Sequence, residues 1–311
     1  HSDSVDNAED LLIEKDPQPT LVFSNKCMTV HQNGWIILDF GKEIAGGIRI
    51  SSHAVENLRM QEKIRIRFGE SVGETCADIG EKGACNNHGP RDFETTLTMY
   101  GDMCTGDTGF RFVRIDFFGE ANFGIKSIFA KEWYEDFEQV KEFKSNDELV
   151  NQIFETAKRT VTLCTQHKIW DGIKRDRLVW IGDMEPEIHS ILHIYGNIKQ
   201  VESSICSAEN HNPLPGWMNT IPSYSMWYLL INAEVLEFSK GKAYFDRHKP
   251  YADRVIKLLN KAITNEGSLD FTKVDECPSD SYFIDWPGNH GSDQERIDAN
   301  KNLLIYVLRN Y

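Results

Sequence analysis

The first part of the chain consists of short segments in which apolar and polar residues alternate. In residues 63–69, Ile64, Ile66 and Phe68 fall on one face and Arg65 and Arg67 on the other, a pattern typical of a half-buried antiparallel strand. Glycines separate the segments from one another, as in a β-sandwich rather than in βαβ units. Comparable segments cover residues 35–40, 47–51, 93–100, 110–117 and 125–133.

The hydrophobic period changes from two to about three and a half near residue 137. Residues 145–148 (Ser-Asn-Asp-Glu) have the form of a capping box, so a helix is expected to follow. A domain boundary is therefore expected within residues 141–145. One apolar stripe of this helix comprises Leu149, Ile153, Ala157, Val161 and Cys164.

Helical periodicity continues to the end of the chain, interrupted by loops rich in proline, asparagine and aromatic residues. A helix is expected after Asp183, with its apolar stripe running to Ile198. At average helix length, this part of the chain has room for roughly five to seven helices. Further helices are predicted over residues 224–238, 243–262 and 295–309.

Residues 170–187 combine five acidic residues, three basic residues and two tryptophans in a segment that is helical only at its end. Carboxylates beside flat aromatic rings suit a sugar-cleaving site, where one carboxyl protonates the glycosidic oxygen and the rings pack on the sugar. A solvated salt-bridge cluster is the alternative. Asp183 is predicted to be a helix N-cap, with Glu185 and Glu187 near the positive end of the dipole.

Composition excludes several classes of function. The net charge of −14 argues against a nucleic-acid partner, and no apolar segment is long enough to span a membrane. Seven cysteines occur without a Cys-x-x-Cys pair, which favours reduced thiols in a cytoplasmic protein. Cys76, Cys85 and His88 lie in one loop, but their spacing matches no known ligand pattern, so neither a metal nor a cofactor is expected.

The segment Asp171-x-x-x-Arg175-Asp176-Arg177-x-x-Trp180-x-Gly182-Asp183 resembles the signature of the bacterial α-L-rhamnosidases, a family of inverting glycoside hydrolases. Three segments before it also resemble that family's β-sandwich. They are residues 38–49, 66–71 and 108–114.

The resemblance implies a β-sandwich followed by a helical toroid of six hairpins. It divides the chain into a polar lead-in (1–19), a β-sandwich domain (20–141) and an α-helical barrel domain (142–311). A complete toroid has twelve helices, so only its N-terminal half is expected here. An unfinished toroid leaves an apolar helix face, which a second copy or a partner chain would cover.

By the same resemblance, the substrate is a terminal α-L-rhamnoside or a related neutral sugar, and Asp176 is the general acid. Asp171 and Asp183 bind sugar hydroxyls, and Trp180 forms a pocket wall near the sugar methyl group. Arg175 and Arg177 orient the carboxylates. Asp285 and Trp286 match a pair that lines the substrate. No residue is assigned as the general base, and the alternative is a catalytically incomplete sugar-binding or structural fragment.

Overall fold

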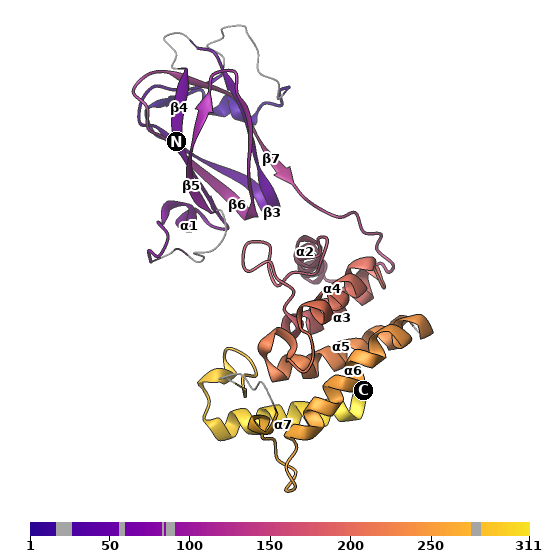
Figure 1. Cartoon of the computed structure of the whole chain (residues 1–311). Coiled ribbons are helices and arrows are strands. Elements are labelled where there is room, and N and C mark those ends of the chain that lie inside the picture. The colour runs from indigo at the N-terminus through magenta and orange to yellow at the C-terminus, as the bar shows by residue number, and fades with distance from the viewer. Residues whose placement is uncertain (17–26, 56–59, 83, 85–90, 240, 275–280) are drawn as a thin grey trace. The chain divides into compact units, whose positions relative to one another are not determined.

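The protein folds into a β unit and a helical unit, seen in a computed structural model that describes residues 1–16, 27–55, 60–82, 84, 91–239, 241–274 and 281–311 (Figure 1). The β unit comprises His1–Tyr134 together with Gly172–Arg177. The helical unit comprises Glu135–Asp171 and Leu178–Tyr311. The predicted order of an antiparallel β part followed by an α part is thereby confirmed.

Among the described residues, the β unit contains one seven-stranded antiparallel sheet, in the order β1-β2-β7-β3-β6-β4-β5. The residues expected to be a polar lead-in supply its first strand, in which Val5 is buried. The strands are β1 (Val5–Asp6), β2 (Met28–Val30), β3 (Trp35–His53), β4 (Gln61–Gly69), β5 (Asp92–Thr98), β6 (Asp102–Phe117) and β7 (Phe123–Glu132).

Strand β3 joins two segments that sequence patterning predicts as separate strands. Its register against β6 shifts between Asp39 and Ile44 and again between Gly46 and Gly47. At Gly47 a Cβ atom would lie 2.2 Å from the Thr105 carbonyl oxygen, so only glycine allows the two strands this close approach. The glycines between the predicted segments therefore mark bulges within one long strand.

Strand β4 has the two faces that its alternating pattern predicts. Ile64, Ile66 and Phe68 are fully buried in the core of the β unit. Arg65 and Arg67 occupy the other face, where their guanidinium groups pair with carboxylates of neighbouring segments. The ion pairs explain how Arg67 can be buried on a face that was expected to be solvated.

A short helix, α1 (Val72–Cys76), follows β4 where a surface loop was expected. The Ser71 side chain accepts a hydrogen bond from the Glu74 amide and so caps the helix. The Glu74 side chain is buried. Cys85 and His88, considered above with Cys76 as metal ligands, lie outside the described residues.

In the part of the chain that the structure describes, six longer helices form the helical unit, together with short 3₁₀ turns. They are α2 (Glu148–Cys164), α3 (Ile181–Tyr195), α4 (Lys199–His211), α5 (Pro222–Ser239), α6 (Lys242–Ala262) and α7 (Asp293–Asn310). None of the described helices is long and apolar enough to cross a membrane.

Two helix predictions are wrong in detail. Helix α2 is capped by the side chain of Asp147 rather than by the predicted box at Ser145, and Leu149 and Ile153 of its apolar stripe are 63% and 59% exposed. The stripe expected to run from Asp183 to Ile198 ends at Tyr195, because the chain leaves α3 at Gly196, whose φ of 74° favours glycine, and Ile198 is the N-cap residue of α4.

The core of the helical unit is centred on α5, which packs against α3, α6 and α7. Met226, Tyr228 and Ile231 of α5 are completely buried. This agrees with a sequence that is apolar almost all round the helix. The termini of these helices and their connecting loops position the candidate site.

Candidate active site

The signature segment forms a loop between α2 and α3. Asp171 closes the base of this loop, because its amide donates to the Leu178 carbonyl at 3.2 Å and its Oδ1 accepts from the Leu178 amide at 2.9 Å. On the α2 side, Thr165 and Ile169 form an isolated β-bridge. Asp171 therefore has a structural role in the loop in addition to the sugar-binding role that the sequence predicts.

The six residues within this loop, Gly172–Arg177, belong to the β unit. Lys174 is buried, and its Nζ lies 2.8 Å from both Glu70 Oε2 and Glu74 Oε1. Burial lowers the pKa of Lys174, but the hydrogen bonds to Glu70 and Glu74 outweigh it and raise the pKa overall. The loop is thus anchored by a charged cluster that the sequence analysis did not identify.

Arg175 and Asp176 lie in the same six residues, and both are exposed. Arg177 was expected to orient carboxylates of the signature. Its guanidinium instead donates to the carbonyl oxygen and to Oδ1 of Asp107, at 2.7 and 3.1 Å. The assignments of Asp176 as general acid and of Arg175 beside it remain predictions.

Asp183 is not the N-cap of α3. The helix begins at Ile181 with Trp180 at the N-cap, and the Asp183 carboxylate lies in the first turn, beside the positive end of the dipole. Asn219 fastens this helix start, since its Oδ1 accepts from the Ile181 amide and its Nδ2 donates to the Val179 carbonyl. Because Asn219 supplies the cap, the Asp183 carboxylate is not needed as one.

Four carboxyl groups and one tyrosine of the helical unit come together around the start of α3. Burial, followed by the charges of Asp183 and Asp171, raises the pKa of Glu187 to about 9. Burial and the charges of Asp183, Asp285 and Asp171 raise the pKa of Tyr224 to about 12. Charges act strongly only at short range, so these couplings indicate that Asp171, Asp183 and Asp285 lie near Tyr224.

Aromatic rings extend along this carboxylate cluster. Trp180 meets Tyr224 edge to face with ring centroids 6.2 Å apart, and Phe283 lies 6.3 Å from Tyr224. Trp286 continues the row 5.3 Å from Phe283 and is 74% exposed. The structure therefore places the predicted residues Trp180 and Trp286 at the two ends of one aromatic row, beside acidic groups.

Two members of this site escaped the sequence analysis. Tyr224 lies in the first turn of α5, after a loop rich in proline and asparagine, and its contact with Trp180 depends on the packing of α5 against α3. Glu187 was expected to stabilise the first turn of α3. It lies in the second turn, where its Oε2 is buried without a hydrogen-bond partner among the described residues. Its pKa of about 9 keeps this carboxyl protonated at neutral pH.

Replacing Gly182 with alanine is expected to disrupt the aromatic row. A Cβ atom at this position would lie 2.2 Å from Cε1 of Tyr224, so the ring must move away from its place. We expect a loss of about 1–3 kcal/mol in the free energy of unfolding, the usual cost of overpacking. Unfolding by denaturant measures this loss. The control is Gly241→Ala, because the Cβ atom of the new alanine would come no closer than 3.6 Å to a neighbouring atom. Equal stability of the two variants would contradict the packing of Gly182 against Tyr224.

Replacing Glu187 with glutamine is expected to stabilise the protein above pH 5. Below pH 4.5, the pKa of this carboxyl in the unfolded chain, the group is protonated in both the folded and the unfolded state. Between pH 4.5 and about 9 it loses its proton only in the unfolded state, so the free energy of unfolding falls as the pH rises. Glutamine cannot ionise. At pH 7 we expect a gain of roughly 1–3 kcal/mol over the wild type, with little difference at pH 4.5. The free energy of unfolding, measured across this pH range for the wild type, Glu187→Gln and the control variant Glu237→Gln, tests the prediction. If the free energy of unfolding of Glu187→Gln changed with pH in parallel with that of the wild type, the prediction would be contradicted.

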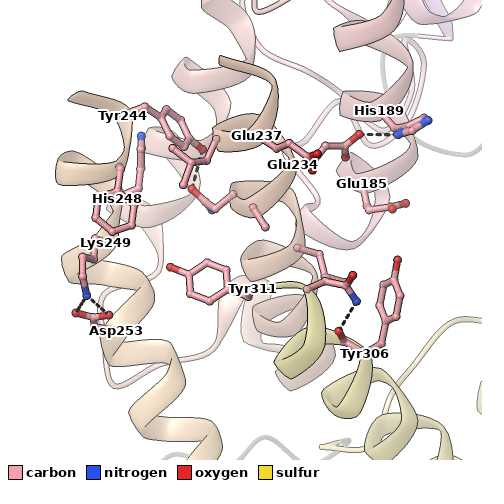
Figure 2. Close-up of a pocket in the computed structure, with 16 residues that line it drawn as sticks. Glu185, His189, Glu234, Glu237, Tyr244, His248, Lys249, Asp253, Tyr306 and Tyr311 are labelled. Carbon is pink, nitrogen blue, oxygen red and sulfur yellow. Dashed lines mark hydrogen bonds and ion pairs between the residues drawn. The ribbon is translucent and has the colours of Figure 1, made fainter. Parts of the chain in front are cut away.

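A separate pocket of about 780 Å³ lies among α3, α5, α6 and α7 (Figure 2). Glu185 and His189 contribute from α3, Glu234 from α5 and Tyr306 from α7. None of the seven predicted site residues is among the residues that line it. The predicted site residues therefore lie outside this pocket.

Neither a protein-family model nor a curated protein sequence matches the chain. Three solved structures share its fold, and the first is a rhamnosidase from Klebsiella oxytoca with rhamnose bound, which has a TM-score of 0.74 and 18% identity over 91% of this chain. A GH78 family rhamnosidase of Bacillus sp. GL1 has a TM-score of 0.65 and 16% identity over 94% of this chain. An α-L-rhamnosidase from Dictyoglumus thermophilum has a TM-score of 0.59 and 16% identity over 90% of this chain. The chain spans 57%, 30% and 33% of those proteins, respectively. The chain therefore has the fold of the matching part of α-L-rhamnosidases.

Proposed function

We propose that this chain carries the sugar-binding and proton-donating side of a glycoside hydrolase that removes terminal α-L-rhamnose, or a related neutral sugar, with inversion. The observation that supports this most is the gathering of Asp171, Asp183 and Asp285 around Tyr224 in a single unit. Three carboxylates beside a row of aromatic rings suit a bound sugar, because its hydroxyl groups donate to carboxylates while its C–H face packs on the rings.

The proposal gives each group a role. Asp171 and Asp183 accept hydrogen bonds from sugar hydroxyls, and Asp285 does so from the loop before α7. Trp180 packs on the apolar side of the sugar near its methyl group, and Trp286, which is largely exposed, borders the entrance. Because the Glu187 carboxyl stays neutral, it adds no third negative charge beside Asp171 and Asp183.

The chemical step assigned to this chain is proton donation by Asp176. In an inverting hydrolase the acid protonates the departing oxygen while a base on the opposite face activates water. Lys174 anchors the loop that carries Asp176 by its pairing with Glu74, a buried group, so the donor has a rigid base. Rigid support of this kind keeps a catalytic group within the small tolerances that proton transfer demands. No general base is assigned.

The alternative is a sugar-binding protein without turnover. Both functions use the same carboxylates and rings, so binding alone does not separate them.

Turnover of methyl α-L-rhamnopyranoside, followed by proton NMR, separates the two functions. Inverting hydrolysis releases β-L-rhamnose first, and the α anomer then appears only as fast as mutarotation allows. Binding without turnover would favour the non-catalytic alternative, whereas first release of the α anomer would contradict inversion. Hydrolysis of methyl α-D-glucopyranoside at an equal rate would contradict the proposed sugar.

A further inference from the structure

Three potential metal ligands of the helical unit meet between α4 and α6, away from the proposed sugar site. Glu202 and Cys206 are four residues apart on α4 and therefore lie on one face of the helix, and His248 reaches them from α6. One oxygen, one sulfur and one nitrogen atom of these side chains all lie within 4.8 Å of one another. Spacing along the sequence does not indicate this cluster, because it depends on the packing of two helices.

His248 shows the second feature of a metal site. The residue is 2% exposed, and its Nδ1 lies 2.7 Å from Glu209 Oε1. Glu209 thereby holds the proton on Nδ1 and leaves the lone pair on Nε2. That Nε2 atom is buried and has no hydrogen-bond partner among the described residues, although Glu202 Oε1 lies 3.7 Å away. A buried nitrogen without a partner is costly unless a ligand occupies it.

A histidine that binds a metal through one nitrogen commonly donates its other N–H to a carboxylate. Glu209 is well placed for this supporting role, because it also accepts from the Tyr228 hydroxyl at 2.5 Å and is held in position by it. This hydrogen-bonded network accounts for Glu209 and for Nδ1 of His248. It does not account for Nε2, which points to the group formed with Cys206 and Glu202.

We propose that Glu202, Cys206 and His248 bind a divalent transition-metal cation that ties α4 to α6. The mixed set of thiolate, imidazole and carboxylate ligands favours Zn²⁺ over Mg²⁺ or Ca²⁺, which prefer oxygen alone. Zinc takes sulfur at about 2.3 Å and nitrogen at about 2.0 Å, so the ligand atoms need to approach by only about 1 Å. Water completes a fourth position.

Arg247 is the competitor for this site. Its guanidinium forms an ion pair with Glu202, but the Arg247 side chain is 61% exposed and can turn into solvent when a cation takes its place. His248 itself borders the pocket of Figure 2 beside Tyr244. Metal binding would therefore exchange a surface ion pair, which contributes little, for three coordinate bonds.

A second group, His189, His193 and Glu234, also has ligand atoms within 4.8 Å. It is the weaker candidate, since both histidines are exposed and their Nδ1 atoms already have partners. His189 Nδ1 lies 2.5 Å from Glu234 Oε1 and His193 Nδ1 lies 2.8 Å from the His189 carbonyl oxygen. This group contains no sulfur, so a spectroscopic test distinguishes it from the cluster at Cys206.

Titration of the reduced, chelator-treated full chain with Co²⁺ tests the proposal. Binding through Cys206 gives one equivalent of Co²⁺ with a near-ultraviolet thiolate-to-cobalt charge-transfer band, which Zn²⁺ removes by displacement. We expect Cys206→Ser to abolish the band and Glu209→Gln to weaken binding about 10–100-fold. Cys104→Ser and His193→Ala are the matched controls and should keep the band.

Binding without a charge-transfer band would overturn the proposal, as would a band that survives Cys206→Ser. Loss of Co²⁺ binding in His193→Ala, with binding kept in Cys206→Ser, would move the site to the exposed histidines and also overturn it. If Cys206→Ser does not fold, Glu202→Gln provides the second variant. This side chain is only partly buried, and its substitution should lower affinity while leaving the far-ultraviolet circular dichroism unchanged.

Discussion

Replacing Asp176 with asparagine is expected to lower hydrolysis of methyl α-L-rhamnopyranoside by about 10²–10⁴-fold, the usual contribution of a general acid. The loss should be far smaller for p-nitrophenyl α-L-rhamnopyranoside, because p-nitrophenolate departs without being protonated. The ratio of kcat/KM values for the two substrates therefore reports on proton donation itself. A general loss of folding or of sugar binding would lower both values equally.

Asp176→Glu is the matched variant for this measurement. It keeps an acidic proton donor and lengthens the side chain by one methylene. We expect Asp176→Glu to keep most of the activity on the methyl glycoside. If Asp176→Asn loses activity on both substrates to the same extent, Asp176 has a structural or binding role and the acid lies elsewhere.

Replacing Lys174 with methionine is expected to cost about 3–5 kcal/mol in the free energy of unfolding of the β unit. The substitution keeps most of the side-chain volume but leaves Glu74, which is 1% exposed, without its cation. Hydrogen exchange should then increase in residues 63–76 and in residues 172–177, which the cluster joins. Turnover should fall as well, because the loop that carries Asp176 loses its anchor.

A double variant gives the control for this prediction. Glu74→Gln together with Lys174→Met removes both charges, so it should be more stable than Lys174→Met alone. Lys158→Met removes a cation paired with the exposed Glu155 and should cost less than about 1 kcal/mol. A Lys174→Met variant as stable as Lys158→Met would contradict the anchoring role of Lys174.

Local patterns in the sequence were sufficient to predict most strands and helices. Residues 64–68 alternate because β4 has one buried face, and α5 is apolar all round because helices pack on several of its sides. Patterns fail where tertiary contacts decide the outcome. The apolar residues Leu149 and Ile153 predicted a buried face of α2, yet both are largely exposed.

In the candidate site, too, some residues could be predicted from the sequence, whereas others depend on tertiary contacts. The family resemblance predicts Asp171, Trp180, Asp183, Asp285 and Trp286 as site residues, and the helical unit brings them near Tyr224 and Phe283. The groups that support the signature lie far from it in sequence, so no local spacing could have shown them. Glu74 meets Lys174 across about a hundred residues, and Asn219 reaches the start of α3 from a different loop.

The ligands of the proposed cation site are also brought together only by tertiary packing. Glu202 and Cys206 alone are an ordinary pair on a helix, and only the approach of His248 from α6 turns them into a set of ligands. The need for a glycine at position 182 of the signature also arises from a tertiary contact. Gly182 has no evident use in the sequence, whereas the structure shows the Tyr224 ring in the space that a side chain would need.

Calorimetric titration of the chain with L-rhamnose tests the proposed sugar site most directly. We predict binding of one sugar per chain by the wild type and its loss in Asp183→Asn, whose exposed side chain can be changed without unfolding α3. D-glucose should not compete. A folded wild-type chain that shows no heat with L-rhamnose, or an Asp183→Asn variant that binds it as well as the wild type, would contradict the account.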